Sequence, residues 1–134
     1  MNLYAFLNPV KVEEKKEIIV SERFKDENGK VVPFVIKALT HGEVEELTKK
    51  SRKVKKVNGQ NVERIDQMEL TNRIIVAGTV QPPFESSELC ENYKVMDPLL
   101  VPGKMLLEGE YKKLLDEISA LAGYQEDEEE QIKN

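Results

Sequence analysis

The fold of this chain is organised around residues 107–124, whose sequence is Leu-Glu-Gly-Glu-Tyr-Lys-Lys-Leu-Leu-Asp-Glu-Ile-Ser-Ala-Leu-Ala-Gly-Tyr. Apolar side chains recur there at steps of three and four, which places them on one stripe of an α-helix. The stripe consists of Leu107, Tyr111, Leu114, Leu115, Ile118, Leu121 and Ala122. Gly123 tolerates the left-handed backbone that follows many helices, and Tyr124 is placed to fold back on Ile118. The stretch therefore predicts an amphipathic helix that buries one face.

A shorter helix is predicted just before it. Ser86 is a suitable N-cap, and Leu89 and Tyr93 stand one turn apart on the same face. Pro98 and Pro102 separate the two helices, because proline interrupts a helix and restricts the residue before it.

The N-terminal third predicts a β-hairpin over about residues 17–39. Alternating apolar residues flank Asn28-Gly29, a strong turn signal. A strict two-residue turn would pair Arg23 with Phe34 and mix the two faces of the sheet. Pairing Phe24 with Phe34, and Val20 with Ala38, keeps the apolar residues on one face. We therefore predict an odd-length loop, of three residues with a bulge or of five, with Pro33 on the outer face.

A second helix is predicted after Thr40, which forms a capping box with Glu43. Val44, Leu47 and Val54 are its expected inward positions. Residues 49–56 carry six positive charges, which indicate either a solvated helix end running into a loop or a surface for nucleic acid or an acidic partner. Residues 57–62 are compatible with a second small hairpin or with a flexible turn.

The next segment, residues 66–80, predicts a buried helix. Asp66 is its cap, and Met68, Ile75 and Val76 are expected to point inward. Residues 74–80 are apolar and β-branched and are also compatible with a strand, but the helical spacing extends back through Leu70. In either form the segment should pack against the helix at 107–122.

The chain begins with an apolar segment and carries an acidic run near residue 130. Leu3, Tyr4, Phe6 and Leu7 indicate either a tail docked on its own domain or a hook for a partner. Residues 125–134 are predicted to be a disordered acidic tail, since like charges repel. That tail is a candidate partner for the basic segment of a neighbouring copy.

Composition excludes several classes of function. The 134 residues carry a net charge of −5, which argues against general nucleic-acid affinity. Cys90 and His41 are the only cysteine and histidine, so we expect no disulfide, metal site, cofactor site or catalytic residue. The first ten residues do not resemble a signal peptide and no apolar run reaches about 20 residues, so we expect a cytoplasmic, non-membrane protein.

Together these patterns predict an α+β fold. We expect one domain over residues 1–124, with the hairpin followed by three to four helices in a helical part over about residues 41–124.

The order of these motifs resembles a known family, the phage tail assembly chaperones, in particular the XkdN-like group of contractile-tailed phages and defective prophages. The resemblance spans roughly residues 3–124. One departure is Lys94, where the family pattern has a glycine. The matching residues are Ser21 to Lys30, Ile36 to Thr40, Pro83, Leu89, Tyr93, Met105-Leu106, Gly109-Glu110-Tyr111, Leu114, Ile118, Leu121 and Gly123-Tyr124.

The resemblance implies a function without catalysis. Such chaperones act in the bacterial host cytoplasm, bind the tape measure protein and keep it soluble during tail assembly. Many also exist as a longer frameshifted form that recruits tail tube protein, and a homo-oligomer is expected. The expected partner-binding residues are Leu3, Phe6, Leu7, Leu99, Leu100, Met105 and Leu106. The alternative function is a small nucleic-acid-binding regulator that uses residues 49–56.

Overall fold

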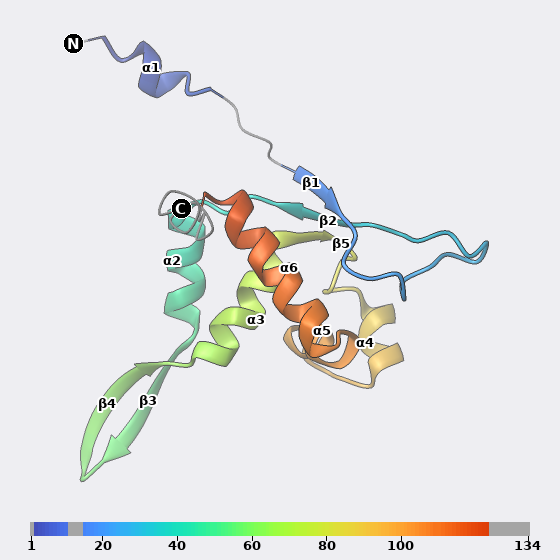
Figure 1. Ribbon diagram of the computed structural model, residues 1–134. Coiled ribbons are helices and arrows are strands. Elements are labelled where there is room, and N and C mark those ends of the chain that lie inside the picture. Colours follow the sequence, from blue (N-terminus) through green and yellow to red (C-terminus); the bar gives the residue numbers. More distant parts are fainter. Residues whose placement is uncertain (1, 11–14, 124–134) are drawn as a thin grey trace, which may run out of the picture.

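The computed structural model describes residues 2–10 and 15–123 and confirms the α+β class (Figure 1). The helices are α1 (Tyr4–Leu7), α2 (His41–Lys50), α3 (Gln67–Gly78), α4 (Ser87–Tyr93), α5 (Val101–Met105) and α6 (Glu108–Leu121), with a 3₁₀ turn η1 (Pro98–Leu100). The strands are β1 (Lys15–Ile18), β2 (Phe34–Lys37), β3 (Arg52–Val57), β4 (Gln60–Ile65) and β5 (Thr79–Gln81).

A three-stranded antiparallel sheet with the order β1-β2-β5 forms one layer of the fold. Its central strand, β2, buries Phe34 and Ile36 and leaves Val35 and Lys37 half-buried. This alternation points one face of the strand at the helices. Helices α3 and α6 cross that face, while α4 and α5 close one end (Figure 1). The core is built from these layers and comprises Ile18, Val20, Phe34, Ile36, Leu39, Ile75, Phe84, Val101, Met105, Leu106, Leu114 and Ile118.

The odd-length hairpin loop is confirmed. The Asp26 amide donates to the Lys30 carbonyl at 2.9 Å, which leaves a three-residue loop that includes Asn28 and ends at Gly29. Gly29 has φ +82°, the left-handed conformation that closes such a turn with a bulge.

The predicted register of this hairpin is wrong. Ile18, not Phe24, lies opposite Phe34, and the ladder is interrupted between β1 and the turn. The observed and predicted pairings differ by an even number of residues, and an even shift leaves every side chain on the same face. Alternation therefore determined which face is buried but not the offset. Phe24 still packs edge-on against Phe34, with ring centroids 5.2 Å apart.

Helices α3 and α6 pack tightly against each other, as predicted. Leu114 and Ile118 are buried, and a Cβ added to Gly78 would lie 2.7 Å from Cγ2 of Ile118. The Tyr111 hydroxyl on α6 donates to Oδ1 of Asn72 on α3 at 2.6 Å. The helix pair therefore depends on a glycine at the contact and on a polar bond at its margin.

The predicted helix caps are largely confirmed. The Glu43 amide donates to the Thr40 hydroxyl at 3.2 Å and the Thr40 amide to Glu43 at 3.0 Å, which completes the capping box. Asp66 accepts the Glu69 amide at 3.0 Å. Ser86 occupies the N-cap of α4 without a side-chain bond. Lys94 ends α4 with φ +56°, so it adopts the left-handed backbone that glycine adopts more readily than other residues.

The helical part predicted over residues 41–124 contains strands as well. Helix α2 ends at Lys50, and β3 and β4 form the hairpin that was one of two alternatives for residues 57–62. Asn58 (φ +54°) and Gly59 (φ +78°) form its two-residue turn, which requires positive φ at both positions. Val54 is on this hairpin and 61% exposed, so its assignment to the inner face of a helix was wrong.

Residues 66–80 combine the two predicted alternatives. Helix α3 continues to Gly78, and strand β5 begins at Thr79. Ile75 is buried as predicted, but Met68 is 79% exposed, so its assignment as an inward residue was wrong. The contact predicted for Tyr124 and the acidic tail lie outside the described residues.

Candidate partner-binding surface

The described residues hold no cluster of histidine, cysteine and carboxylate side chains suited to a metal ion. Cys90 is half-buried in α4, and His41 is exposed beside Glu45, with Nε2 3.6 Å from the carboxylate. Within the same part of the chain, no helix is long and apolar enough to cross a bilayer.

Helix α1 exposes most of its apolar side chains. Phe6 is 76% exposed and Leu7 74%, and Leu3 and Tyr4 are also more than half exposed. The segment is held by local bonds: the Tyr4 amide donates to Oδ1 of Asn2, and Nδ2 of Asn8 donates to the Tyr4 carbonyl. In Figure 1, α1 stands clear of the remaining elements. Docking on its own domain would bury these side chains, so the structure does not match that alternative.

The other predicted partner-binding residues separate into two groups. Met105 and Leu106 are 8% and 7% exposed and belong to the core at the α5–α6 corner. Leu99 is half-buried, and Leu100 is half exposed on η1. Met105 and Leu106 thus stabilise the domain, whereas Leu100 remains available at the surface.

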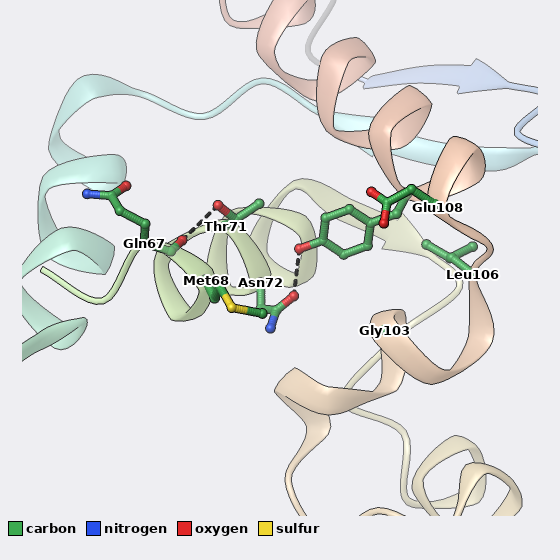
Figure 2. Close-up of a pocket in the computed structure, with 8 residues that line it drawn as sticks. Gln67, Met68, Thr71, Asn72, Gly103, Leu106 and Glu108 are labelled. Atoms are coloured by element: carbon green, nitrogen blue, oxygen red, sulfur yellow. Dashed lines mark hydrogen bonds between the residues drawn. The ribbon is translucent and has the colours of Figure 1, made fainter.

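An open groove of about 380 Å³ lies between α3, α5 and the start of α6 (Figure 2). Buried Leu106 and half-buried Tyr111 contribute to its lining, and exposed Met68 stands at its margin. Burial raises the pKa of the Tyr111 phenol, which stays neutral and donates to Asn72. The full lining is Gln67, Met68, Thr71, Asn72, Gly103, Leu106, Glu108 and Tyr111.

Sequence reasoning missed this groove. Its margin depends on Met68 facing outward, whereas the periodicity of residues 66–80 placed that side chain inward. The spacing of polar Gln67 and Thr71 was the available signal, because residues four apart occupy one helix face.

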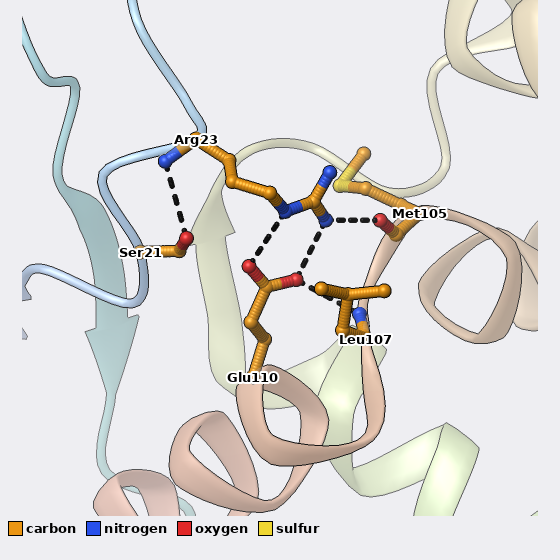
Figure 3. A network of polar contacts seen from close by, with 5 residues as sticks. All are labelled: Ser21, Arg23, Met105, Leu107 and Glu110. Atoms are coloured by element: carbon orange, nitrogen blue, oxygen red, sulfur yellow. Dashed lines mark hydrogen bonds and ion pairs between the residues drawn. The ribbon is translucent and has the colours of Figure 1, made fainter.

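An ion pair fixes the α5–α6 corner beside the core (Figure 3). Nε and Nη2 of Arg23 donate to the two carboxylate oxygens of Glu110 at 2.9 and 2.7 Å, and Nη2 also donates to the Met105 carbonyl at 3.1 Å. The Leu107 amide donates to Glu110 at 2.8 Å, and Ser21 accepts the Arg23 amide at 3.1 Å. This bidentate geometry is the stronger form of an arginine–carboxylate pair.

The same contacts control the charge of Glu110. The hydrogen bonds from Arg23, the largest cause, and from the Leu107 amide lower its pKa to about 2 against the opposing effect of burial. The carboxylate also raises the pKa of Arg23 through its hydrogen bond. Both residues belong to motifs that carry the family resemblance, and the structure gives them a common role in joining the hairpin to α6.

The basic segment forms a projecting two-stranded element, β3–β4, which we call the basic ribbon (residues 52–65) (Figure 1). None of its residues is buried. Lys53 contacts Glu69 on α3 at 2.9 Å, and this hydrogen bond, with a second from Arg73, lowers the pKa of Glu69. The segment predicted to be a helix end is therefore mainly an exposed strand.

A family model and a curated relative identify the family of this chain. The family model described as phage XkdN-like tail assembly chaperone protein matches residues 3–134. Phage-like element PBSX protein XkdN of Bacillus subtilis (strain 168) is 37% identical, over 99% of this chain and 96% of that protein. The uncharacterized protein YqbN of the same strain is 39% identical, over 90% of this chain and 85% of its own length. The crystal structure of the protein YqbN superposes with a TM-score of 0.72 at 32% identity, covering 93% of this chain and 98% of that one.

Proposed function

This chain belongs to the family of phage XkdN-like tail assembly chaperones, and from that premise we propose that it binds the tape measure protein and keeps it soluble during tail assembly. Such a role needs no bond to be made or broken. It needs apolar contact area that is exposed in the free chaperone and covered in the complex. We propose that it is not an enzyme and acts in the cytoplasm of the bacterial host.

The observation that carries this proposal is the exposure of α1. Phe6 and Leu7 are each about three-quarters exposed, although burial of a side chain of this size stabilises a fold by roughly 1.5–3 kcal/mol. Because the fold does not bury these side chains, their burial against a partner would stabilise a complex instead. A tape measure protein that is long and helical would present apolar stripes of matching character.

The groove between α3, α5 and α6 supports the same proposal. It is open, it combines apolar Leu106 and Tyr111 with polar Asn72 and Gln67, and it lies on rigidly packed helices. Apolar grooves with a few polar groups are common binding sites for an amphipathic helix. We propose that α1, Leu100 and this groove together contact the tape measure protein, and that a longer frameshifted form recruits tail tube protein.

Co-expression with the tape measure protein tests the proposal. Wild-type chain should keep that protein in the soluble fraction and co-purify with it, whereas Phe6→Asp should lose both effects because a carboxylate cannot enter an apolar interface. Met96→Asp is the matched control, since Met96 is fully exposed and lies outside the proposed surface. Equal behaviour of the two variants, or an insoluble tape measure protein with the wild-type chain, would overturn the proposal.

A further inference from the structure

The basic ribbon is a charged part of the described chain that the proposed function does not use. Its cations are Arg52, Lys53, Lys55, Lys56 and Arg64, and its one carboxylate is Glu63. The ribbon thus has a formal charge of +4, whereas the whole chain carries −5. This segregation of charge gives the molecule one strongly positive projection on an acidic body.

Neither strand of the ribbon contains a buried residue, so the ribbon has no hydrophobic core of its own. An isolated two-stranded hairpin is marginally stable at best, because it buries little apolar area. Here Lys53 also stands directly opposite Arg64, and like charges in that position destabilise a sheet. Glu69 forms an ion pair with Lys53 and offsets its repulsion with Arg64. In residues 2–10 and 15–123, no carboxylate lies within 4.0 Å of the other four cations of the ribbon. A negatively charged partner would relieve this repulsion.

The same chain contains a segment of matching charge. Residues 126–130 read Glu-Asp-Glu-Glu-Glu, five consecutive carboxylates. We propose that the basic ribbon of one copy docks on residues 126–130 of a second copy, so that the chain associates with itself through complementary charge. The exposed Val54 and Val57 add apolar contact to the charge pairing.

A second copy is the occupant because most of the chain's own acidic segment cannot reach the outer half of the ribbon, where Lys55 and Lys56 lie. Ala122 and Gly123 line a small hollow with His41 and Val44, so the end of α6 lies beside the first turn of α2. The ten residues of α2 then span about 15 Å, and Lys56 lies roughly 10–15 Å further along β3.

The number of residues after Gly123 limits how far the acidic segment can reach within one molecule. An extended chain advances at most about 3.6 Å per residue, so three residues beyond Gly123 can reach about 11 Å and seven can reach about 25 Å. Only the last carboxylate therefore approaches the outer half of the ribbon in the same molecule. The whole run can lie along the ribbon when it comes from another molecule.

Sedimentation of the full chain at low and high salt tests the proposal. The wild type should associate at 50 mM NaCl, and the association constant should fall by about tenfold or more at 500 mM because added salt screens exposed charges. Lys55→Glu/Lys56→Glu and Glu128→Lys/Glu129→Lys should each be monomeric. Their 1:1 mixture should associate again, because each variant then finds opposite charge on the other. Lys112→Glu/Lys113→Glu, on the exposed face of α6, is the matched control and should behave as wild type.

Three outcomes would overturn the proposal. The first is a wild-type chain that stays monomeric at 50 mM NaCl. The second is association that survives either pair of reversals, or a mixture that stays monomeric. The third is binding of a 30-base-pair DNA duplex by the wild type that Lys55→Glu/Lys56→Glu abolishes while no self-association is detected, which would assign the ribbon to nucleic acid.

Discussion

The ion pair between Arg23 and Glu110 should make the stability of this domain depend on pH in a defined window. Replacing Glu110 by glutamine removes the charge and keeps the shape of the side chain. The folded-state pKa of Glu110 is about 2, against an ordinary value of 4.5. A carboxyl group whose pKa is lower in the folded state stabilises the fold above its ordinary pKa, and this stabilisation is lost as the pH falls from about 4.5 toward 2.

The magnitude follows from the same values. A difference between 4.5 and about 2 corresponds to at most about 3 kcal/mol at neutral pH. The Arg23 side chain is 48% exposed, so water screens the pair and we expect about 1–2 kcal/mol. Glu110→Gln should lower the free energy of unfolding by that amount at pH 7. The difference from wild type should shrink steadily between pH 4.5 and pH 2.

Urea unfolding followed by far-ultraviolet circular dichroism measures this difference at each pH. Asp116→Asn is the matched control, because Asp116 is an exposed carboxyl on the same helix, and a surface change of this kind usually stays within about 0.5 kcal/mol. A loss at pH 7 no larger than that of the control would refute the role assigned to the pair. So would a loss that is the same at pH 7 and at pH 2.

Three further substitutions test the packing and the backbone. Gly78→Ala should destabilise the fold by about 1–3 kcal/mol, because the new methyl group would lie 2.7 Å from Ile118. Gly109→Ala is the control and should not destabilise the fold, since its methyl group would have no neighbour within 4 Å. Thermal unfolding of the two variants measures the difference. Lys94→Gly should stabilise the fold by about 0.5–1 kcal/mol, since glycine adopts a φ of +56° without strain; an unchanged or lower midpoint would contradict this. Tyr111→Phe should cost about 1 kcal/mol in urea unfolding by removing the hydroxyl that bonds to α3, and a neutral result would show that water replaces that bond.

Periodicity and capping rules predicted the local elements of the fold well. The stripe from Tyr111 to Leu121 identified α6 and its contact with α3, and Thr40 and Asp66 marked two helix starts. These features depend on residues close together in sequence, so local rules suffice. The α+β class followed from them.

Features that depend on distant residues were not predictable in the same way. The observed offset of the β1–β2 ladder places buried Ile18 opposite buried Phe34, and alternation cannot distinguish offsets that differ by two residues. The basic ribbon was obscured because its lysines also suit a helix end. The α3–α5–α6 groove depends on Met68 facing outward, which is a property of the assembled helices.

The partner-binding surface was predicted only in part from the sequence. The sequence does not show whether an apolar residue belongs to the core or to a contact surface. Buried Leu106 and exposed Phe6 could therefore not be distinguished before the fold was known. The Arg23–Glu110 pair brings together residues 87 positions apart, and no local pattern connects them.

Hydrogen–deuterium exchange of the chain, free and in complex with the tape measure protein, tests the central claim most directly. We predict that amides of α1 (Tyr4–Leu7) and of the groove (residues 67–72 and 103–111) exchange more slowly in the complex, while those of α2 are unchanged. Exchange at α1 that is identical in the free chain and in a verified complex would contradict the claim that this exposed apolar helix is what the chaperone offers its partner.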